Sequence, residues 1–201
     1  MTDYITLAGC GTGEYTEKKS VFLGYAAPIL TEDEAIAFVR GIRKKHADAR
    51  HNVYAYRVGA NLTRYSDDGE PQGTAGMPVL DLLRHADITN AVLVVTRYFG
   101  GTLLGTGGLV RAYTAAGKAA LADAGTKLCR EMRTCVVRAP YGEYGKLADA
   151  LSRFEATAAE PVFAADVTLT ITMPAVCADA FAAWLFDTSL GTLLPEWMEN
   201  A

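Results

Sequence analysis

The chain has 201 residues, 50% of them hydrophobic and 21% charged, a composition that excludes a disordered or fibrous protein. Its net charge of −4 excludes a generic polyanion binder, because residues 1–128 hold 14 Lys and Arg against 13 Asp and Glu, and residues 129–201 hold 5 against 10. No apolar stretch approaches the ~20 residues of a bilayer crossing, and a signal-peptide pattern is missing, so we expect a cytoplasmic protein without membrane contact.

The first elements alternate between strand and helix patterns. Residues 21–29 are an apolar run with a proline, Pro28, near its end, and they predict a strand. Thr31 then has the position of a helix N-cap before an acidic first turn, and apolar residues at helical spacing continue to about His46. The basic last turn of this helix suits either phosphate contact or simple pairing with the helix dipole. Residues 53–58 and 62–66 follow as a predicted β-hairpin.

The next segment leads to the centre of the predicted sheet. A turn cluster at residues 67–71 precedes a short helix with Pro78 in its first turn. The continuous apolar run of residues 91–96 predicts a central strand. A glycine-rich segment, residues 97–108, leaves this strand and enters a helix that we expect to end near Gly125.

The second half has its own pattern of strand, helix, strand, strand, helix, strand. The strands are expected at residues 134–139, 157–163, 167–173 and after Gly191. This βαββαβ order is that of a ferredoxin-like domain. A helix end followed by a polar stretch indicates a domain boundary, and we predict domains at residues 1–128 and 129–201. The fold class is therefore α+β.

The glycine-rich segment is a candidate anion site. Its glycines follow a buried strand and precede a helix, so that backbone N–H groups and the helix N-terminus can face an anion, with arginines adding charge. The spacing fits neither a Walker loop nor the dinucleotide fingerprint. The alternative is that the glycines only allow a tight turn. The candidate anion-binding residues are Arg97, Tyr98, Gly100, Gly101, Gly105, Gly107, Gly108 and Arg111.

Tyr98 and Phe99 stand where the predicted strand opens into this segment. Because successive strand residues face opposite sides of a sheet, we expect one ring in the core and the other presented as a stacking face. A stacking face would suit RNA binding.

Asp67, Asp68 and Glu70 form an acidic turn. Carboxylates so close together suit a divalent cation, or the acid and base of a hydrolase, although calcium-loop spacing is missing. The simpler interpretation, which we favour, is that they pair with Arg97 or Arg111 and lock the two loops together.

The remaining reactive residues form no catalytic set in the sequence. None of the four cysteines stands in a C-x-x-C pair, and the three histidines show no zinc-finger spacing and no evident partner. A nucleophile with its base is not recognisable either. We expect no metal, no cofactor and, on balance, binding rather than catalysis.

Three motifs together resemble the signature of the IMPACT/YigZ family. They are Asp67-Asp68-Gly69-Glu70-Pro71, Gly73-Thr74-Ala75-Gly76, and Arg97-Tyr98-Phe99-Gly100-Gly101 with Leu104-Gly105 and Gly107-Gly108-Leu109. The resemblance covers about residues 18–124, and the second half looks like the small C-terminal domain of bacterial members, with a weaker signature of its own.

The resemblance implies a specific fold. The first domain would have the two-layer fold of the second domain of ribosomal protein S-five, with a left-handed βαβ crossover. The second domain would be ferredoxin-like, similar to domain five of elongation factor G. Eukaryotic relatives regulate translation by competing for a ribosome-associated activator of the general amino-acid control kinase. They use an additional N-terminal domain, so that partner is not transferred to this chain.

The resulting hypothesis is a translation-associated regulatory or binding protein. It would contact RNA phosphate or a ribosome-bound protein partner through the loop from Arg97 to Arg111, with no DNA partner expected. The alternative is an enzyme acting on a small phosphorylated or nucleotide ligand, with a metal at the acidic turn. Burial of both arginines against Asp67 and Asp68 would instead make the motif architectural.

Overall fold

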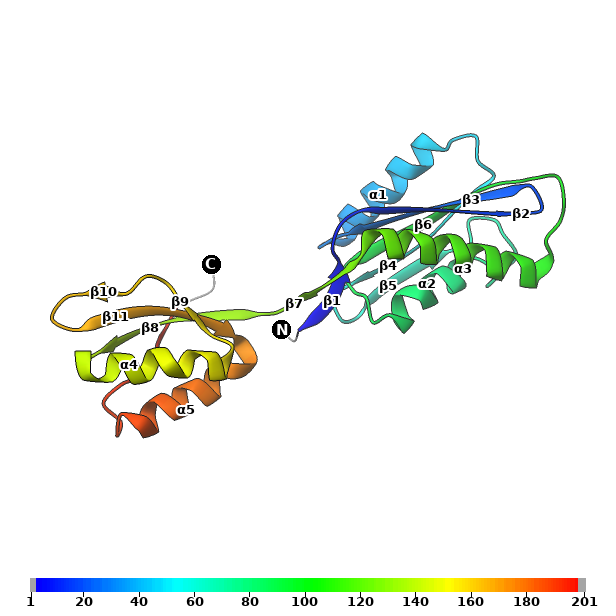
Figure 1. Ribbon diagram of the computed structural model, residues 1–201. Helices are drawn as coiled ribbons and strands as arrows, with labels where there is room; N and C mark the ends of the chain where they lie inside the picture. Colours follow the sequence, from blue (N-terminus) through cyan, green and yellow to red (C-terminus); the bar gives the residue numbers. More distant parts are fainter. Residues whose placement is uncertain (1–2, 199–201) are drawn as a thin grey trace. The chain divides into compact units, whose positions relative to one another are not determined.

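The protein is a mixed α/β protein of two compact units, which a computed structural model describes over residues 3–198 (Figure 1). One unit comprises residues 4–129, and the other comprises residues 130–198 together with Asp3. No helix within residues 3–198 is both long enough and apolar enough to span a membrane.

The first unit is built on an antiparallel sheet. Its strands, in spatial order, are β2 (Gly11–Glu17), β3 (Ser20–Pro28), β6 (Ala91–Tyr98), β4 (His51–Val58) and β5 (Leu62–Ser66). Its helices are α1 (Glu32–Lys45), α2 (Gly76–His85) and α3 (Gly105–Ala124). A separate ladder pairs β1 (Tyr4–Leu7) with β7 (Thr126–Cys129). The predicted strand at the centre is confirmed as β6, which pairs with both β3 and β4.

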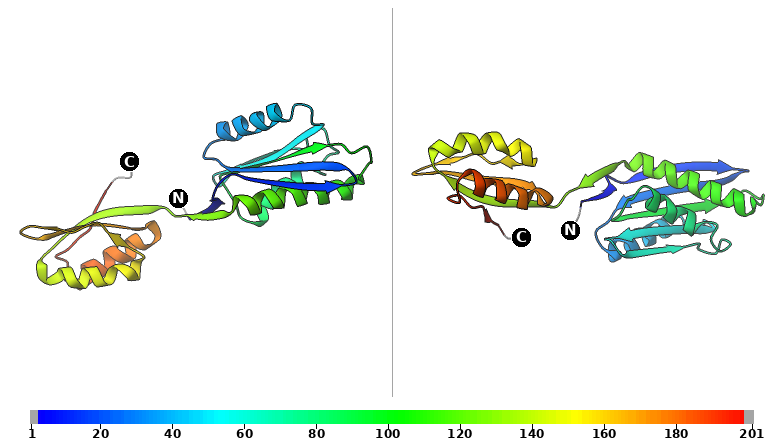
Figure 2. Two further views of the ribbon diagram at one scale, coloured as in Figure 1. Left: turned by 45° about the horizontal axis from the view of Figure 1, so that its top comes forward. Right: turned by 90° about the horizontal axis from the view of Figure 1, so that it is seen from below.

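Helices cover both faces of this sheet (Figures 1 and 2). On one face, Ala35 and Val39 of α1 pack against the β6 side chains Val92 and Val94. On the other face, α2 and α3 share a core with the alternate β6 residues. The expected two-layer arrangement is therefore wrong. Because β6 is apolar at consecutive positions, each of its faces needs a covering layer to exclude water.

Helix α3 lies unusually close to β2 and β3, and three glycines make this possible. A β-carbon at Gly11, Gly13 or Gly24 would come within 2.5 Å of the α3 backbone. The sequence did not predict β1, β2 or β7. Glycine-rich strands lack the side-chain alternation that reveals burial, and β1 and β7 pair across more than a hundred residues.

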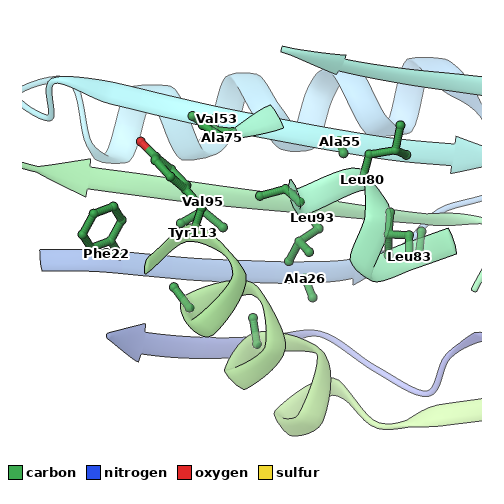
Figure 3. Packing of buried hydrophobic residues seen from close by; sticks show 14 of the residues in the cluster. Phe22, Ala26, Val53, Ala55, Ala75, Leu80, Leu83, Leu93, Val95 and Tyr113 are labelled. Atoms are coloured by element: carbon green, nitrogen blue, oxygen red, sulfur yellow. The ribbon is translucent and has the colours of Figure 1, made fainter. Parts of the chain in front are cut away.

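The core under α2 and α3 is completed by an aromatic pair (Figure 3). Tyr113 of α3 is fully buried and meets Phe22 of β3 edge to face, with ring centres 5.1 Å apart. Such a geometry favours aromatic pairs beyond the area they bury. The Tyr113 ring is thereby fixed, and its hydroxyl is positioned for the site described below.

The second unit follows the predicted order of elements. Its elements are β8 (Met132–Ala139), α4 (Tyr141–Ala150), η1 (Leu151–Phe154), β9 (Thr157–Ala158), β10 (Val162–Phe163), β11 (Val167–Pro174), η2 (Ala175–Cys177), α5 (Ala178–Thr188) and β12 (Glu196–Trp197). The sheet order is β10-β11-β8-β12, with β9 also pairing with β11. The expected strand 157–163 is divided in two around Pro161, which has no N–H for a ladder.

Candidate functional site

The central feature of the site is a buried ion pair. Glu70 lies in the turn after β5, and Arg97 is the next-to-last residue of β6. Arg97 Nη1 is 2.6 Å from Glu70 Oε1, and the two side chains are only 6% and 4% exposed. The Tyr113 hydroxyl donates to the same oxygen at 2.8 Å. Burial, followed by the nearby carboxylate, raises the pKa of Tyr113, so its hydroxyl remains a donor. The predicted pairing of the acidic turn with Arg97 is confirmed.

Arg97 also carries an unused donor. Among the buried side-chain nitrogen and oxygen atoms of residues 3–198, Arg97 Nε is the one that has no hydrogen-bond partner. The guanidinium carbon lies 5.5 Å from the ring centres of both Phe22 and Phe99, which is cation–π distance. A buried donor without a partner costs free energy, and native proteins keep few of them. Since the Arg97 side chain also lines the cleft described below, it is a candidate for ligand contact.

Asp67 has a structural role. Its Oδ1 accepts hydrogen bonds from the N–H groups of Ala75 at 3.0 Å and Gly76 at 2.7 Å, and its Oδ2 accepts from Gly73 N–H at 2.9 Å. These contacts satisfy backbone donors at the beginning of α2, as a capping carboxylate does. The expected pairing of Asp67 with an arginine is wrong, because backbone donors occupy both of its oxygens.

Asp68 pairs with a different arginine from those expected. Its Oδ1 is 2.5 Å from Arg43 Nη2, and its Oδ2 accepts from Asn52 N–H at 2.6 Å. Arg43 comes from the last turn of α1, 25 residues before Asp68 in the sequence. The carboxylates of the acidic turn are thus used by protein donors. No cluster of three or more potential metal ligands was found within residues 3–198.

His51, the first residue of β4, is oriented by the same turn. Its Nδ1 lies 2.7 Å from the main-chain oxygen of Asp68. A carbonyl oxygen only accepts, so Nδ1 carries the proton and donates. The other ring nitrogen, Nε2, is 3.8 Å from Glu70 Oε1, which is too long for a hydrogen bond. His51 was not predicted as a site residue, because its partner is a backbone atom.

These residues border a cleft of about 400 Å³. Glu70, Arg97 and His51 form its polar side. Arg50 and Phe99 lie beside them, with the Arg50 guanidinium carbon 5.9 Å from the Phe99 ring centre. The remaining lining comes from Gly69, Pro71 and the α3 end of the glycine-rich segment, at Leu103, Leu104, Gly105, Thr106 and Leu109. The volume is within the usual range for small-ligand sites.

The start of α3 opens into this cleft. Its N-cap, Leu104, makes no side-chain capping bond, and the first turn contains no acidic residue. The first N–H groups of a helix have no partner inside the helix, and they carry partial positive charge. The helix begins at Gly105, so the last glycines of the segment belong to its first turn. Gly105 has φ of +69°, a conformation that glycine adopts without strain.

The structure separates the predicted anion-binding residues. Arg97 and Gly105 line the cleft. Gly100 instead packs against the turn between β2 and β3, where a β-carbon would lie 2.1 Å from the Lys19 backbone. Arg111 is exposed on α3. Gly101 and Gly107 are exposed with open space around them, and Gly108 is buried beneath Leu104. Arg111 lies outside the cleft lining.

Tyr98 is on the opposite face of the sheet from the cleft. Its hydroxyl accepts from His46 Nδ1 at 2.9 Å and donates to Asp48 Oδ1 at 3.1 Å, while Tyr25 donates to His46 Nε2 at 2.7 Å. Burial, followed by the charge of Lys45, lowers the pKa of His46. Tyr98, which the sequence grouped with Arg97 as an anion-binding residue, therefore does not line the cleft. The ring presented there is Phe99, which is 42% exposed.

The fold and the site together define a two-domain α/β protein with a buried arginine–glutamate pair beside a helix start. The Impact N-terminal domain family matches residues 18–121, and the domain of unknown function DUF1949 matches residues 137–192. IMPACT family member YvyE of Bacillus subtilis is 34% identical over 193 residues, covering 95% of this chain and 89% of YvyE. IMPACT family member YigZ of Escherichia coli is 36% identical over 180 residues, covering 88% of each chain. The chain belongs to the IMPACT family.

More distant and structural comparisons agree with this membership. Protein IMPACT of Homo sapiens is 34% identical over 97 residues, which cover 45% of this chain and 30% of that protein. A solved structure described as "Crystal structure of an hypothetical protein" has a TM-score of 0.64 and 33% identity, with 100% of both chains covered.

Proposed function

We propose that this protein is a translation-associated regulator that contacts RNA phosphate on the ribosome through the cleft at the start of α3. The observation that carries this proposal is the unpartnered Nε of the buried Arg97, in a cleft that also receives an uncapped helix N-terminus. Both features offer hydrogen-bond donors, and the helix end adds partial positive charge. A phosphate group satisfies such donors.

The charge balance of the cleft supports an anionic ligand. Glu70 and Arg97 compensate each other, so the net charge of their pair is zero. Arg50 then adds a positive charge that has no carboxylate partner within residues 3–198, and its guanidinium lies beside Phe99. Phe99 provides an exposed ring for base stacking. Since the whole chain is acidic, we expect attraction to RNA to be local to this cleft.

The connection to translation is supported by family membership. Eukaryotic members of the family that the motifs resemble regulate translation. The likeness of the first unit to the second domain of ribosomal protein S-five, and of the second unit to the ferredoxin-like domain five of elongation factor G, belongs to the same proposal.

The alternative enzyme receives less support. It would need the acidic turn to hold a metal ion, whereas Asp67, Asp68 and Glu70 already accept hydrogen bonds from the protein. Moving these carboxylates to a metal would break the hydrogen bonds at the start of α2. It would also leave the buried Arg97 without a compensating negative charge.

Ribosome cosedimentation tests the proposal. Arg97→Ala is a poor probe, since it would leave Glu70 buried without its partner. Arg50→Ala is suitable because Arg50 is exposed and lines the cleft. Arg40→Ala is its matched control, because Arg40 is an exposed arginine of α1, on the other face of the sheet. We expect salt-sensitive association that Arg50→Ala weakens and Arg40→Ala does not. Association that is insensitive to salt, or equal in both variants, would contradict the proposal.

Arg111→Ala measures how far the contact extends along α3. Because Arg111 is exposed but outside the cleft lining, we expect its removal to weaken association less than removal of Arg50. A larger loss with Arg111→Ala would move the binding surface from the cleft to the outer face of α3.

A further inference from the structure

We infer that the cleft selects ribonucleotides over deoxyribonucleotides, and that His51 makes the distinction. The inference rests on the proposed function, because it concerns the sugar attached to a phosphate held in the same cleft. It adds a specificity-determining residue that neither the sequence motifs nor the ion pair indicates.

The orientation of the His51 ring is fixed. Its Nδ1–H donates to the main-chain oxygen of Asp68 at 2.7 Å. That main chain is itself held, because the Asp68 carboxylate binds Arg43 at 2.5 Å and Asn52 N–H at 2.6 Å. Turning the ring over would place a carbon atom against the carbonyl and lose a partly buried hydrogen bond. With its proton on Nδ1, the ring presents Nε2 as an acceptor.

This acceptor has no partner of its own. His51 lines the cleft, and its nearest polar contact from Nε2 is Glu70 Oε1 at 3.8 Å, beyond hydrogen-bond distance. No hydrogen bond to Nε2 was found among residues 3–198. The polar groups that border the cleft are donors at Arg97, Arg50 and the start of α3, and acceptors at Glu70 and His51. Glu70 Oε1 already accepts from Arg97 and Tyr113, whereas His51 Nε2 accepts from no group among the described residues.

A ribonucleotide matches this division. Its phosphate accepts from the arginines and the helix N-terminus, its base has the face of Phe99 to stack on, and its 2′-hydroxyl donates to His51 Nε2. The cleft volume of about 400 Å³ is sufficient for one nucleotide. A deoxyribonucleotide lacks the hydroxyl and would leave Nε2 covered without a donor. From the value of one neutral hydrogen bond, the expected preference for RNA is about 3- to 10-fold.

The test compares fluorescent single-stranded probes of one sequence, oligouridine and oligodeoxyuridine, by anisotropy titration. His51→Asn is the informative variant, because the asparagine amide can still donate to the Asp68 carbonyl but has no group in place of Nε2. His85→Ala is the control, since His85 is exposed at the end of α2 and does not line the cleft. A thermal melt of each variant shows that it is folded.

We expect the wild type and His85→Ala to bind the ribose probe about 3- to 10-fold more tightly, and His51→Asn to bind both probes equally. A 2′-O-methyl probe, which has lost the donor hydrogen, should behave like the deoxy probe. Equal binding of both probes by the wild type, or a ribose preference that persists in His51→Asn, would overturn the inference and leave the proposed function intact. Salt-sensitive binding of neither probe would overturn both.

Discussion

Two neighbouring residues of β6, Arg97 and Tyr98, enter two polar clusters on opposite faces of one sheet. Arg97 joins an ionic cluster with Glu70 and Tyr113, which is buried under α3. Tyr98 joins a cluster with His46, Tyr25 and Asp48 at the end of α1, where neutral rings carry most of the contacts. Strand alternation alone sends two adjacent polar residues into environments with different energetics.

The difference concerns what happens when one member is lost. In the ionic cluster, each charge is compensated only by its partner, so removal of one leaves the other buried and unpaired. In the Tyr98 cluster, Asp48 is exposed and water can replace a lost hydroxyl. The two clusters should therefore respond to matched substitutions with effects of different size.

The largest effect is expected from Glu70→Ala. Loss of the carboxylate leaves the Arg97 guanidinium buried without compensation, at a cost of about 3 to 5 kcal/mol in the free energy of unfolding. Urea denaturation followed by circular dichroism measures this loss. Asp81→Ala is the control, because the Asp81 side chain is 43% exposed and forms an i,i+3 pair on α2. Equal losses in both variants would show that the Glu70 pair is not a central stabilising contact.

A smaller effect is expected from Tyr113→Phe. This change removes the hydroxyl that donates to the Glu70 carboxylate and keeps the ring that packs on Phe22. A hydrogen bond to a charged acceptor contributes about 1.5 to 3 kcal/mol. The same urea titration measures the change, and a loss below that of Tyr98→Phe would contradict the ranking of the two clusters.

Tyr98→Phe is the matched substitution on the other face. It removes a hydroxyl shared between His46 and Asp48. Because Asp48 is exposed and water can replace the lost donor, we expect a loss of only about 0.5 to 1.5 kcal/mol. Because Tyr98 does not line the cleft, the variant should bind the RNA probe as the wild type does. Weakened RNA binding with an unchanged melt would place Tyr98 in the binding surface after all.

The smallest effect is a pH dependence from His46. Burial lowers its pKa in the folded protein below the ordinary value of 6.5, so the unfolded chain binds more protons near that pH. The contribution of His46 to stability is complete above pH 6.5 and is lost as the pH falls toward the lowered folded value. Urea titrations at several pH values should show the advantage of the wild type over His46→Gln shrinking on acidification. A constant difference would mean that the pKa of His46 is the same in the folded and the unfolded protein.

Side-chain patterns made much of the fold predictable. We predicted β6 from its apolar run, α1 from its N-cap and helical spacing, and β11 from its alternation. Each pattern directly reflects which faces of the element are buried. The strands β1, β2 and β7 were missed, since glycine carries no such signal and distant pairing has no local signature. The two-layer expectation came from the family resemblance, and it failed because the apolar run of β6 needs a covering layer on both of its faces.

Within the site, only the pairing of the acidic turn with Arg97 was predictable, because it follows from charge complementarity. A buried glutamate needs a cation, and Arg97 stands in the motif that the sequence singled out. Arg43 was missed as the partner of Asp68, because that contact depends on where α1 ends relative to β4. His51 was missed because its orienting partner is a main-chain oxygen. Phe99 and Tyr98 were distinguishable only once the faces of β6 were known.

The most direct test of the RNA-binding cleft is the salt dependence of affinity for the oligouridine probe. We expect the logarithm of affinity to fall linearly with the logarithm of salt concentration. Arg50→Ala should reduce the slope by about 1, and Arg40→Ala should leave it unchanged. Identical slopes for the wild type and both variants would contradict the assignment of the cleft as the site of phosphate contact.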